Sequence, residues 1–360
     1  MKFQLPTYQA PNFEEERFVN APECTLETVK KDGVAPDNYH ALSVYPEYYK
    51  IQEKWYLAHQ SRMDCVPVFT GQGIEIVEFR NLKLGDQVVL GRTEDASQGI
   101  YLHSSGFKDS DEANDVFAFR TGRSRETAYS KDYDYLYRLL EYEKEHGYVV
   151  WVLGPAVSFD HDARHAVGSL VEKGYVDALL AGNALATHDL EGALLKTALG
   201  QDIYTQVSYP NGHYNHLDLI NRVRRSGSIP KFIEEYQIDN GIIHACEKFQ
   251  VPYVLAGSIR DDGPLPPVFG NAYEAQDAMR AHTRKATTVI CLATQLHTIA
   301  TGNMTPAYTE VDGKIRPVYI YSVDISEFVV NKLRDRGTLE VTTMVTNVQD
   351  FVVNLDRNLK

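Results

Sequence analysis

The second part of the chain repeats one pattern: an uninterrupted apolar run, then small and polar residues, then an amphipathic stretch. Six such runs stand at residues 148–153, 176–181, 252–257, 287–293, 317–323 and 341–345. Strands without polar alternation are buried on both faces, which is typical of parallel sheets covered by helices. The pattern therefore predicts an α/β fold with a parallel, doubly wound, Rossmann-like sheet over residues ~130–355.

The first part of the chain has a different texture. Short runs rich in Val, Ile and Phe alternate with Gly and Asp between residues 66 and 104, which predicts a small antiparallel β-domain. The stretch 46–62 has an apolar spacing near 3.6 residues and predicts a helix. A length of 360 residues suits two domains. We therefore expect a β-rich domain over 1–130 and a larger domain over 131–360.

The composition excludes several classes of partner. The formal charge is −13, and no basic stretch is longer than 222–225, which disfavours nucleic acid and anionic membranes. The four cysteines are far apart, and the start of the chain lacks the apolar core of a signal peptide, so we expect a cytoplasmic protein. Tyrosine outnumbers phenylalanine by 23 to 14, which suggests polar packing such as that between subunits.

Small and polar residues stand directly after each apolar run. Carboxyl ends of parallel strands share one edge of a sheet, where ligands bind near a topological switch point. Caps and turns also use Gly, Asn and Asp, but a charged cluster at so many strand ends favours a ligand site. Along the chain these residues are Gly154-Pro155-Ala156, Gly182-Asn183-Ala184, the stretch from Ser258 to Gly263, Thr294-Gln295-Leu296-His297, Asp324 and Asn347.

The acid that closes the fifth run suggests the ligand. In dinucleotide folds an acid in such a place binds the adenosine ribose hydroxyls and repels a 2′-phosphate, so Asp324 favours NAD over NADP; the alternative is a helix cap. The usual G-x-G-x-x-G fingerprint is missing, since the segment after the fourth run has its only glycine at Gly302. The phosphates are expected instead at a helix N-terminus with Thr294 or Thr298, or at the turn that begins at Gly154.

The case for a metal is weak. The acidic segment 109–115 lacks the regular spacing of a calcium loop. His161 and His165 have the i, i+4 spacing of a zinc helix, but Asp160 and Asp162 there suit a helix cap and first turn. We therefore expect no metal site.

Acid–base groups are expected in two loops. The stretch 211–216 holds His213, Asn215 and His216 and suits a substrate-orienting loop, although a loop histidine is often only solvated.

The adjacent carboxylates Asp261 and Asp262 follow Arg260 and precede a proline-rich, stiff segment. Because neighbouring side chains point in different directions, one carboxylate can pair with Arg260 while the other holds a substrate ammonium or takes a proton. The alternative is a salt-bridged turn.

Nucleophilic chemistry has little support. Ser158, Ser258 and Cys291 follow or end strands, but none lies in a G-x-S-x-G elbow, and no P-loop is present. Cys246 and Cys291 fall inside apolar patterns, so we expect them to be buried and inert.

Several long strings resemble the LOR/SDH conserved-domain family, which includes alternative ornithine cyclodeaminases and the cyclodeaminase half of bifunctional arginine dihydrolase–ornithine cyclodeaminases. They recur in the right order within residues ~130–355. The resemblance implies a Rossmann-type NAD domain without the glycine fingerprint, and an oligomer. The strings are residues 174–191, 211–229, 254–266, 275–280, 292–307, 323–337 and 345–351.

The resemblance also implies site residues. For the cofactor these are Gly154, Pro155, Ala156, Gly182, Asn183, Ala184, Thr294, Thr298, Asn303 and Asp324. The loop Ser258–Asp262 and the residues Asn215 and His216 would face the nicotinamide and the substrate. His297, from its place after the fourth run, is a further catalytic candidate. Residues 1–130 resemble the family only loosely.

The reaction that the resemblance implies is hydride transfer from ornithine to NAD and back. The substrate α-amine loses a proton to a base, for which Asp262 is our choice. The resulting imine closes onto the δ-amine, ammonia leaves, and reduction yields proline. Arg260, or Arg120 or Arg123, would bind the substrate carboxylate.

Two other functions stay open. One is an NAD enzyme of other chemistry, such as a saccharopine- or homospermidine-type condensation. The other is an NAD-binding protein without catalysis. Reduction of bound NAD by an amino acid would separate them.

Overall fold

The structure is a computed structural model, and it describes residues 3–108, 130–261, 263–326 and 338–360. Contacts divide the chain into two compact units. Unit 1 comprises Met1–Ala128, Asn303–Val318 and Arg336–Glu340, and unit 2 comprises Tyr129–Gly302, Tyr319–Asp335 and Val341–Lys360. The chain thus returns to unit 1 after residue 302, where the sequence predicted an uninterrupted second domain.

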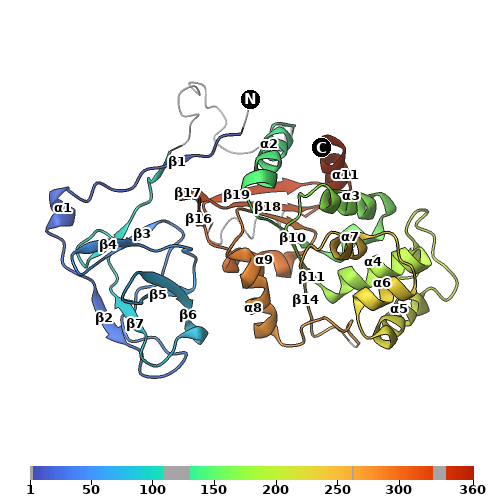
Figure 1. Ribbon diagram of the computed structural model, residues 1–360, viewed down its shortest axis with the longest axis horizontal. Helices are drawn as coiled ribbons and strands as arrows, with labels where there is room; N and C mark the ends of the chain where they lie inside the picture. The colour runs from blue at the N-terminus through green and yellow to red at the C-terminus, as the bar shows by residue number, and fades with distance from the viewer. Residues whose placement is uncertain (1–2, 109–129, 262, 327–337) are drawn as a thin grey trace. The chain divides into compact units, whose positions relative to one another are not determined.

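Unit 1 is built from short antiparallel strands (Figure 1). One sheet has the order β2-β7-β5-β6 and another the order β4-β3-β8, and β1 pairs with β9 and β16 with β17. The antiparallel β-rich character predicted for the first part of the chain is confirmed. The elements are β1 (Thr7–Tyr8), α1 (Glu16–Val19), β2 (Thr25–Thr28), β3 (Glu47–Ile51), β4 (Lys54–Leu57), β5 (Cys65–Phe69), β6 (Ile74–Glu78), η1 (Phe79–Asn81), β7 (Gln87–Leu90), β8 (Ile100–Leu102), β9 (Phe107–Lys108), β16 (Tyr308–Val311) and β17 (Lys314–Pro317).

The helix predicted over 46–62 is wrong, because this stretch forms the hairpin of β3 and β4. Gln52 and Glu53 take φ angles of 53° and 62°, and two such residues in succession make the tight turn that joins two antiparallel strands. Tyr49 is fully buried and pairs across the strands with Tyr56. Packing of aromatic side chains on a sheet thus outweighed a helical spacing.

Unit 2 contains the parallel six-stranded sheet that the apolar runs predicted, and each run forms one strand. The sheet order is β14-β11-β10-β15-β18-β19, which in chain order is 3-2-1-4-5-6, the order of dinucleotide-binding folds. The strands are β10 (Val149–Leu153), β11 (Ala178–Gly182), β14 (Tyr253–Ala256), β15 (Thr288–Leu292), β18 (Tyr319–Asp324) and β19 (Glu340–Val345), with a small pair β12 (Thr197–Ala198) and β13 (Gln201–Asp202).

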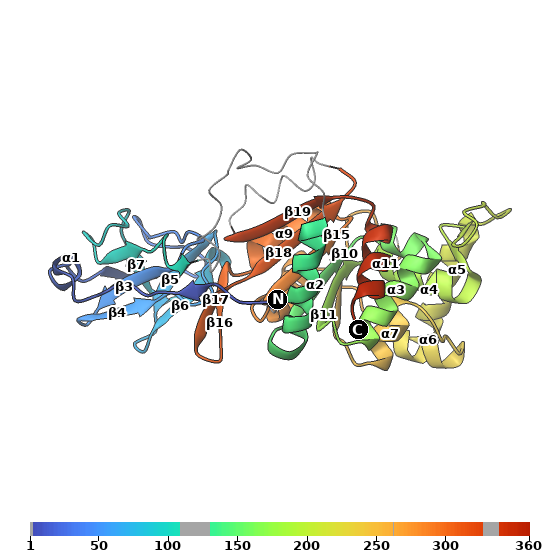
Figure 2. The same ribbon diagram turned by 90° about the horizontal axis from the view of Figure 1, so that it is seen from above.

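Helices cover this sheet (Figure 2). Figure 2 shows α2 and α11 side by side, and a Tyr133–Phe351 ring contact joins them. α3 packs on α7 and α11, while α4 packs on α5 and on the 3-10 segment η2. The helical elements are α2 (Ser130–His146), η2 (Pro155–Phe159), α3 (His161–Glu172), α4 (Asn183–Leu195), α5 (His213–Ser226), α6 (Ile229–Glu235), α7 (Ile242–Lys248), α8 (Ala272–Thr283), α9 (Gln295–Met304) and α11 (Val348–Asn358).

Candidate active site

The carboxyl ends of the parallel strands lie side by side at one edge of the sheet of unit 2. Leu153, the last residue of β10, is in register with Ala181 of β11 and Leu292 of β15, and Leu292 is in register with Val323 of β18. Between β10 and β15 the chain order of the strands reverses. Such a switch point opens the crevice in which these folds bind ligands, so the polar residues after the strands are candidates for one site.

The backbone is tightly packed at this switch point. A Cβ atom on Gly154 would lie 2.0 Å from the carbonyl oxygen of Ala293, so only glycine fits there. The Gly154 amide donates to the carbonyl of Leu292 at 2.8 Å. Ala293 itself has a φ of 51°, a left-handed conformation that costs an alanine roughly 1 kcal/mol or more. Strained backbone of this kind is common at ligand sites.

His297 reaches across the edge to the neighbouring strand end. It lies in the first turn of α9, and its Cε1 atom is 3.0 Å from where a Cβ on Gly182 would stand. Because β10 separates β11 from β15, the imidazole lies over the end of β10. Burial lowers the pKa of His297 below its ordinary value. The ring is therefore neutral at pH 7, and one ring nitrogen is available as an acceptor.

Asn183 and Asp261 hold the loop after β14. The Asn183 side-chain oxygen accepts from the Leu265 amide at 3.0 Å, and its nitrogen donates to Asp261 at 3.5 Å. The Asp261 carboxylate also accepts from the Ser258 amide at 2.7 Å. These bonds shape the loop, and no Arg260–Asp261 ion pair occurs among the described residues. Asp262 lies outside the described residues.

The cofactor candidates on the other side of the switch point differ in position. Asp324 accepts from the Ser326 amide with Oδ1 at 2.9 Å, as the capping alternative requires, and its half-buried carboxylate has a second oxygen for a ligand. Thr294 precedes α9 at the edge. Thr298 is buried and bonds the Cys291 thiol, and Asn303 is about 12 Å along α9 from Gln295 at ~1.5 Å per residue.

Other strand-end candidates also differ in exposure. Gly154 is buried, while Pro155, Ala156, Gly182 and Ala184 are half-buried at the starts of η2 and α4. The Asn347 side chain caps α11 by accepting from two amides of its first turn.

A second polar cluster lies between α4 and α5. Glu191 is fully buried and accepts hydrogen bonds from His188 (3.0 Å), the Thr197 hydroxyl (2.7 Å) and the Gly200 amide (3.0 Å). Asn215 donates to the same Thr197 hydroxyl at 2.9 Å. A buried carboxylate with several donors keeps its charge and orders its neighbours.

His216 completes this cluster. Its ring lies edge-on to that of His188, with centroids 6.1 Å apart. Its Nδ1 atom is buried without a hydrogen-bond partner among the described residues. Partial burial lowers the pKa of His216, and the nearby Glu191 charge opposes this only in part. A neutral histidine with an unused ring nitrogen can take a proton or a hydrogen bond.

Sequence reasoning missed His188 and Glu191. Both stand in the stretch that follows β11, three residues apart on one helix face. The helix that carries them has no polar face, so both side chains have to be buried. A histidine and a glutamate three residues apart in such a helix could have indicated a buried pair, because isolated charges are not buried.

Glu191 should make stability depend on acidity. Burial raises its pKa, but bonds from His188, Gly200 and Thr197 outweigh this and lower it below 4.5. A depressed pKa contributes stability above the unfolded value, and this stability is lost as the pH falls through the folded value. In urea unfolding between pH 7 and pH 3, we expect Glu191→Gln to be about 1.5–3 kcal/mol less stable than wild type at pH 7 and to lose less stability than wild type as the pH falls below 4.5. The control Glu75→Gln, at an exposed position, should show the same pH dependence of stability as wild type. If Glu191→Gln also had the wild-type pH dependence, the lowered pKa assigned to Glu191 would be wrong.

The remaining candidates are structural. Asp160 caps α3 by accepting from the Ala163 amide, as the capping interpretation predicted, and His161 is exposed beside Asp162. All four cysteines are buried, which confirms the prediction for Cys246 and Cys291. Burial raises the pKa of Cys291 to about 12, so its thiol is not a nucleophile at pH 7.

Unit 1 offers two further features. Among the described residues, His40, Glu47 and Glu94 form a group that could hold a metal ion. One ligand atom from each lies within 4.8 Å of the others. Glu47 already accepts from His40 (2.8 Å), Tyr49 (2.6 Å) and the Ser43 amide (2.7 Å), which makes it part of a buried hydrogen-bonded cluster.

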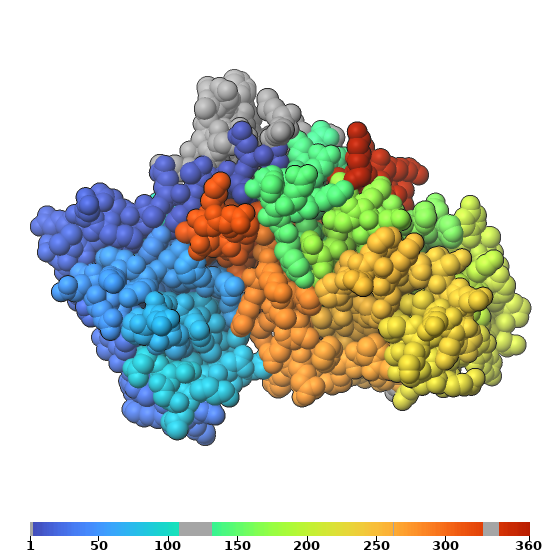
Figure 3. All heavy atoms as spheres, viewed as in Figure 1, coloured from blue at the N-terminus to red at the C-terminus, as the bar shows by residue number. Residues whose placement is uncertain are grey.

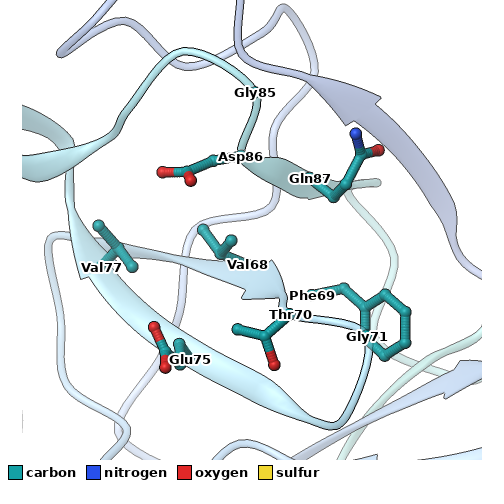
Figure 4. Close-up of a pocket in the computed structure, with 9 residues that line it drawn as sticks. All are labelled: Val68, Phe69, Thr70, Gly71, Glu75, Val77, Gly85, Asp86 and Gln87. Atoms are coloured by element: carbon teal, nitrogen blue, oxygen red, sulfur yellow. The ribbon is translucent and has the colours of Figure 1, made fainter.

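A hollow of about 440 Å³ opens on the sheet that contains β5, β6 and β7 (Figure 4). Glu75 and Asp86 are its acids and Val68 and Val77 its apolar wall, and it has no histidine or cysteine. It therefore lacks the imidazole that His297 provides at the strand-end edge of unit 2.

The described ranges contain no helix with both the length and the apolar character needed to span a bilayer.

Comparison with known proteins agrees with this geometry. The profile of the family "Arginine dihydrolase ArgZ-like, C-terminal, Rossmann fold" matches residues 136–355. An ornithine cyclodeaminase of Methanocaldococcus jannaschii is 36% identical over 349 residues, covering 94% of this chain and 78% of the relative.

Two solved structures extend the likeness. The crystal structure of a conserved LOR/SDH protein of Methanococcus maripaludis S2 has a TM-score of 0.83 at 34% identity and covers 94% of this chain and 98% of that one. The ternary complex of AgrE with ornithine and NAD⁺ has a TM-score of 0.59 at 34% identity and covers 94% of this chain and 46% of that one. With its 3-2-1-4-5-6 sheet and its match over residues 136–355, the chain belongs to the ArgZ-like Rossmann family that the LOR/SDH resemblance indicated.

Proposed function

We propose that the protein is an NAD-dependent ornithine cyclodeaminase, which converts ornithine to proline and ammonia. The observation that carries this proposal is the likeness to an ornithine cyclodeaminase over 94% of the chain at 36% identity. The AgrE complex with ornithine and NAD⁺, which matches 94% of the chain, supports both the substrate and the cofactor.

The residues at the strand-end edge fit NAD. Gly154 keeps side-chain atoms away from the switch point, and the half-buried starts of η2 and α4 offer main-chain amides to phosphates. The second carboxylate oxygen of Asp324 suits a ribose hydroxyl. Thr298 is buried against the Cys291 thiol near the end of β15, and Asn303 lies near the far end of α9, so Thr294 is our preferred hydroxyl. When bound, NAD accepts a hydride from the substrate and returns it to the cyclic product.

The residues of the chain supply binding and proton transfer. We propose Asp262 as the base that takes a proton from the substrate α-amine. Exposed Arg260 would bind the substrate carboxylate. His216 and His297 are both neutral at pH 7, so either can accept a hydrogen bond from a substrate ammonium. Asp261 and Asn183 position Arg260 and Asp262, because their hydrogen bonds hold the loop after β14 in place.

Ornithine turnover tests the proposal directly. Purified protein supplied with NAD and ornithine should release ammonia and proline in equal amounts, with no net NADH because the cofactor is restored in each cycle. Lysine, putrescine and an ornithine-free sample are the controls. Steady accumulation of NADH, or a condensation product with a keto acid or an amine, would instead indicate the saccharopine- or homospermidine-type chemistry. If the protein binds NAD but converts none of these substrates, it would be an NAD-binding protein without catalysis.

Asp262→Asn separates the base from the cofactor site. We expect the variant to bind NAD as wild type does but to lose turnover, because an amide cannot accept the amine proton. Loss of NAD binding, measured by fluorescence titration, would assign Asp262 a structural role instead.

We also propose that the protein lies in the cytoplasm and forms a homo-oligomer. The four cysteines are buried and form no disulfide in the described part of the chain, which suits a reducing compartment.

A further inference from the structure

One segment of unit 2 exposes an unusual amount of apolar surface. Tyr204 is 75% exposed and Val207 64% exposed. Isolated apolar side chains on a surface are normal, but a contiguous group marks an interaction site. The exposed large apolar residues of this segment, here called the apolar patch, are Leu199, Tyr204, Val207, Tyr209, Tyr214 and Leu217.

The tip of the apolar patch is an ordered hairpin. Gln201 forms a β-bridge with Ser208, and the Asp202 amide donates to the carbonyl of Val207 at 2.9 Å. The Asp202 carboxylate accepts from the amides of Tyr204 (2.9 Å) and Thr205 (2.7 Å). The backbone that carries the exposed side chains is therefore held in place, so binding through this segment costs little backbone entropy.

The base of the hairpin is fastened to α5. A Cβ on Gly200 would lie 2.3 Å from the backbone of Gly212, so the two strands of the loop touch. Tyr214 and Leu217 are also exposed, and because they are three residues apart they lie on one face of α5, the helix that follows the hairpin. Figures 1 and 2 both show the loop before α5 projecting from unit 2, and its yellow-green atoms form a margin of that unit in Figure 3.

Charge limits which partner can meet this surface. The chain carries a net charge of −13, so two copies repel each other over most of their surfaces. Residues 199–217 contain a single charged residue, Asp202, whose carboxylate is already occupied by donors of the hairpin. This segment is thus a face on which two copies can approach without strong repulsion.

The exposed area suits a contact with a like surface. Six large side chains, which are 49% to 75% exposed, offer roughly 600 Å² in all, close to the ~800 Å² per partner of a standard interface. Tyrosine is also enriched at interfaces, since its ring buries area while its hydroxyl stays bonded or wet.

We propose that the apolar patch is the surface through which a second copy of this chain docks, patch against patch around a twofold axis. This inference rests on the homo-oligomer proposed above and assigns its surface, and it is independent of the reaction.

The molar mass of the full chain in solution tests the proposal. By sedimentation velocity, wild type should be a dimer or a larger even-numbered oligomer at micromolar concentration. Val207→Asp, which sets two carboxylates against each other at the contact, should raise the dissociation constant at least about tenfold. Leu84→Asp, a matched change at an exposed leucine of unit 1, should leave the mass unchanged. A monomeric wild type, or a Val207→Asp variant with wild-type mass and fold, would overturn the proposal.

Cysteine cross-linking gives a second readout that does not depend on weakening the contact. Because all four native cysteines are buried, Tyr204→Cys adds an exposed thiol to a chain that otherwise has none. Treatment with a short bifunctional thiol reagent should link two Tyr204→Cys chains in high yield, and Leu84→Cys chains only at the level of random collision. Equal yields for the two variants would contradict the assignment.

Discussion

Gly154→Ala is expected to abolish NAD binding and to destabilise unit 2 by about 3 kcal/mol. The added methyl would stand 2.0 Å from the carbonyl oxygen of Ala293, well inside van der Waals contact. The methyl is bonded directly to the Cα atom and the oxygen is part of the backbone, both at the ends of adjacent strands, so neither can rotate away. Relief requires β10 and β15 to separate at the switch point, and overpacking of this kind costs about 1–3 kcal/mol or more.

The loss of binding has the same origin. Ala293 already holds a φ of 51°, and the Gly154 amide is tied to the carbonyl of Leu292. Moving these atoms would displace the turn 154–156 and the start of α9, from which the cofactor is expected to be held. Isothermal titration with NAD and urea unfolding would measure the two effects.

Gly270→Ala is the matched control. Gly270 also lies in unit 2, and a Cβ atom there would meet nothing within 4 Å. We expect this variant to bind NAD normally and to change the free energy of unfolding by less than about 1 kcal/mol. If Gly154→Ala bound NAD with wild-type affinity, the crevice between β10 and β15 would not be the cofactor site.

Asp189→Ala is expected to lower the free energy of unfolding by about 3–5 kcal/mol, because it would leave the buried charge of Arg164 without its carboxylate partner. The Arg164 Nε atom donates to the Asp189 carboxylate at 2.9 Å, and the two side chains are 3% and 0% exposed. The same carboxylate accepts from the amides of Ile242 (3.0 Å) and Ile243 (2.8 Å). One side chain therefore joins α3, α4 and the first turn of α7.

Asp162→Ala provides the comparison within unit 2. Asp162 is exposed in the first turn of α3 and pairs only with exposed His161 at 3.1 Å, so its removal should cost at most about 1 kcal/mol. Urea unfolding followed by circular dichroism measures both variants, since the described helices longer than four residues lie almost wholly in unit 2. A loss below about 1 kcal/mol for Asp189→Ala would show that the pair is not essential to the packing of these helices.

Much of unit 2 was predictable from local pattern. The apolar runs at 148–153 and 287–293 form β10 and β15, which are buried along their whole length. A strand covered on both faces has no polar position, so its sequence is conspicuous. Unit 1 was less predictable. The stretch 46–62 became a hairpin, because burial of Tyr49 and pairing across the turn at 52–53 outweighed the helical spacing.

The sequence by itself determined the α/β class, the six strands, the edge where the candidate residues gather, and the family. These features follow from local apolar content and from long matching strings. Only the tertiary structure decided which of these residues meet. The strand order 3-2-1-4-5-6 brings His297 against Gly182, and the packing of α5 on α4 brings His216 to His188. Spacing along the chain cannot predict such contacts, because the choice of neighbouring strands and helices depends on the burial of whole surfaces.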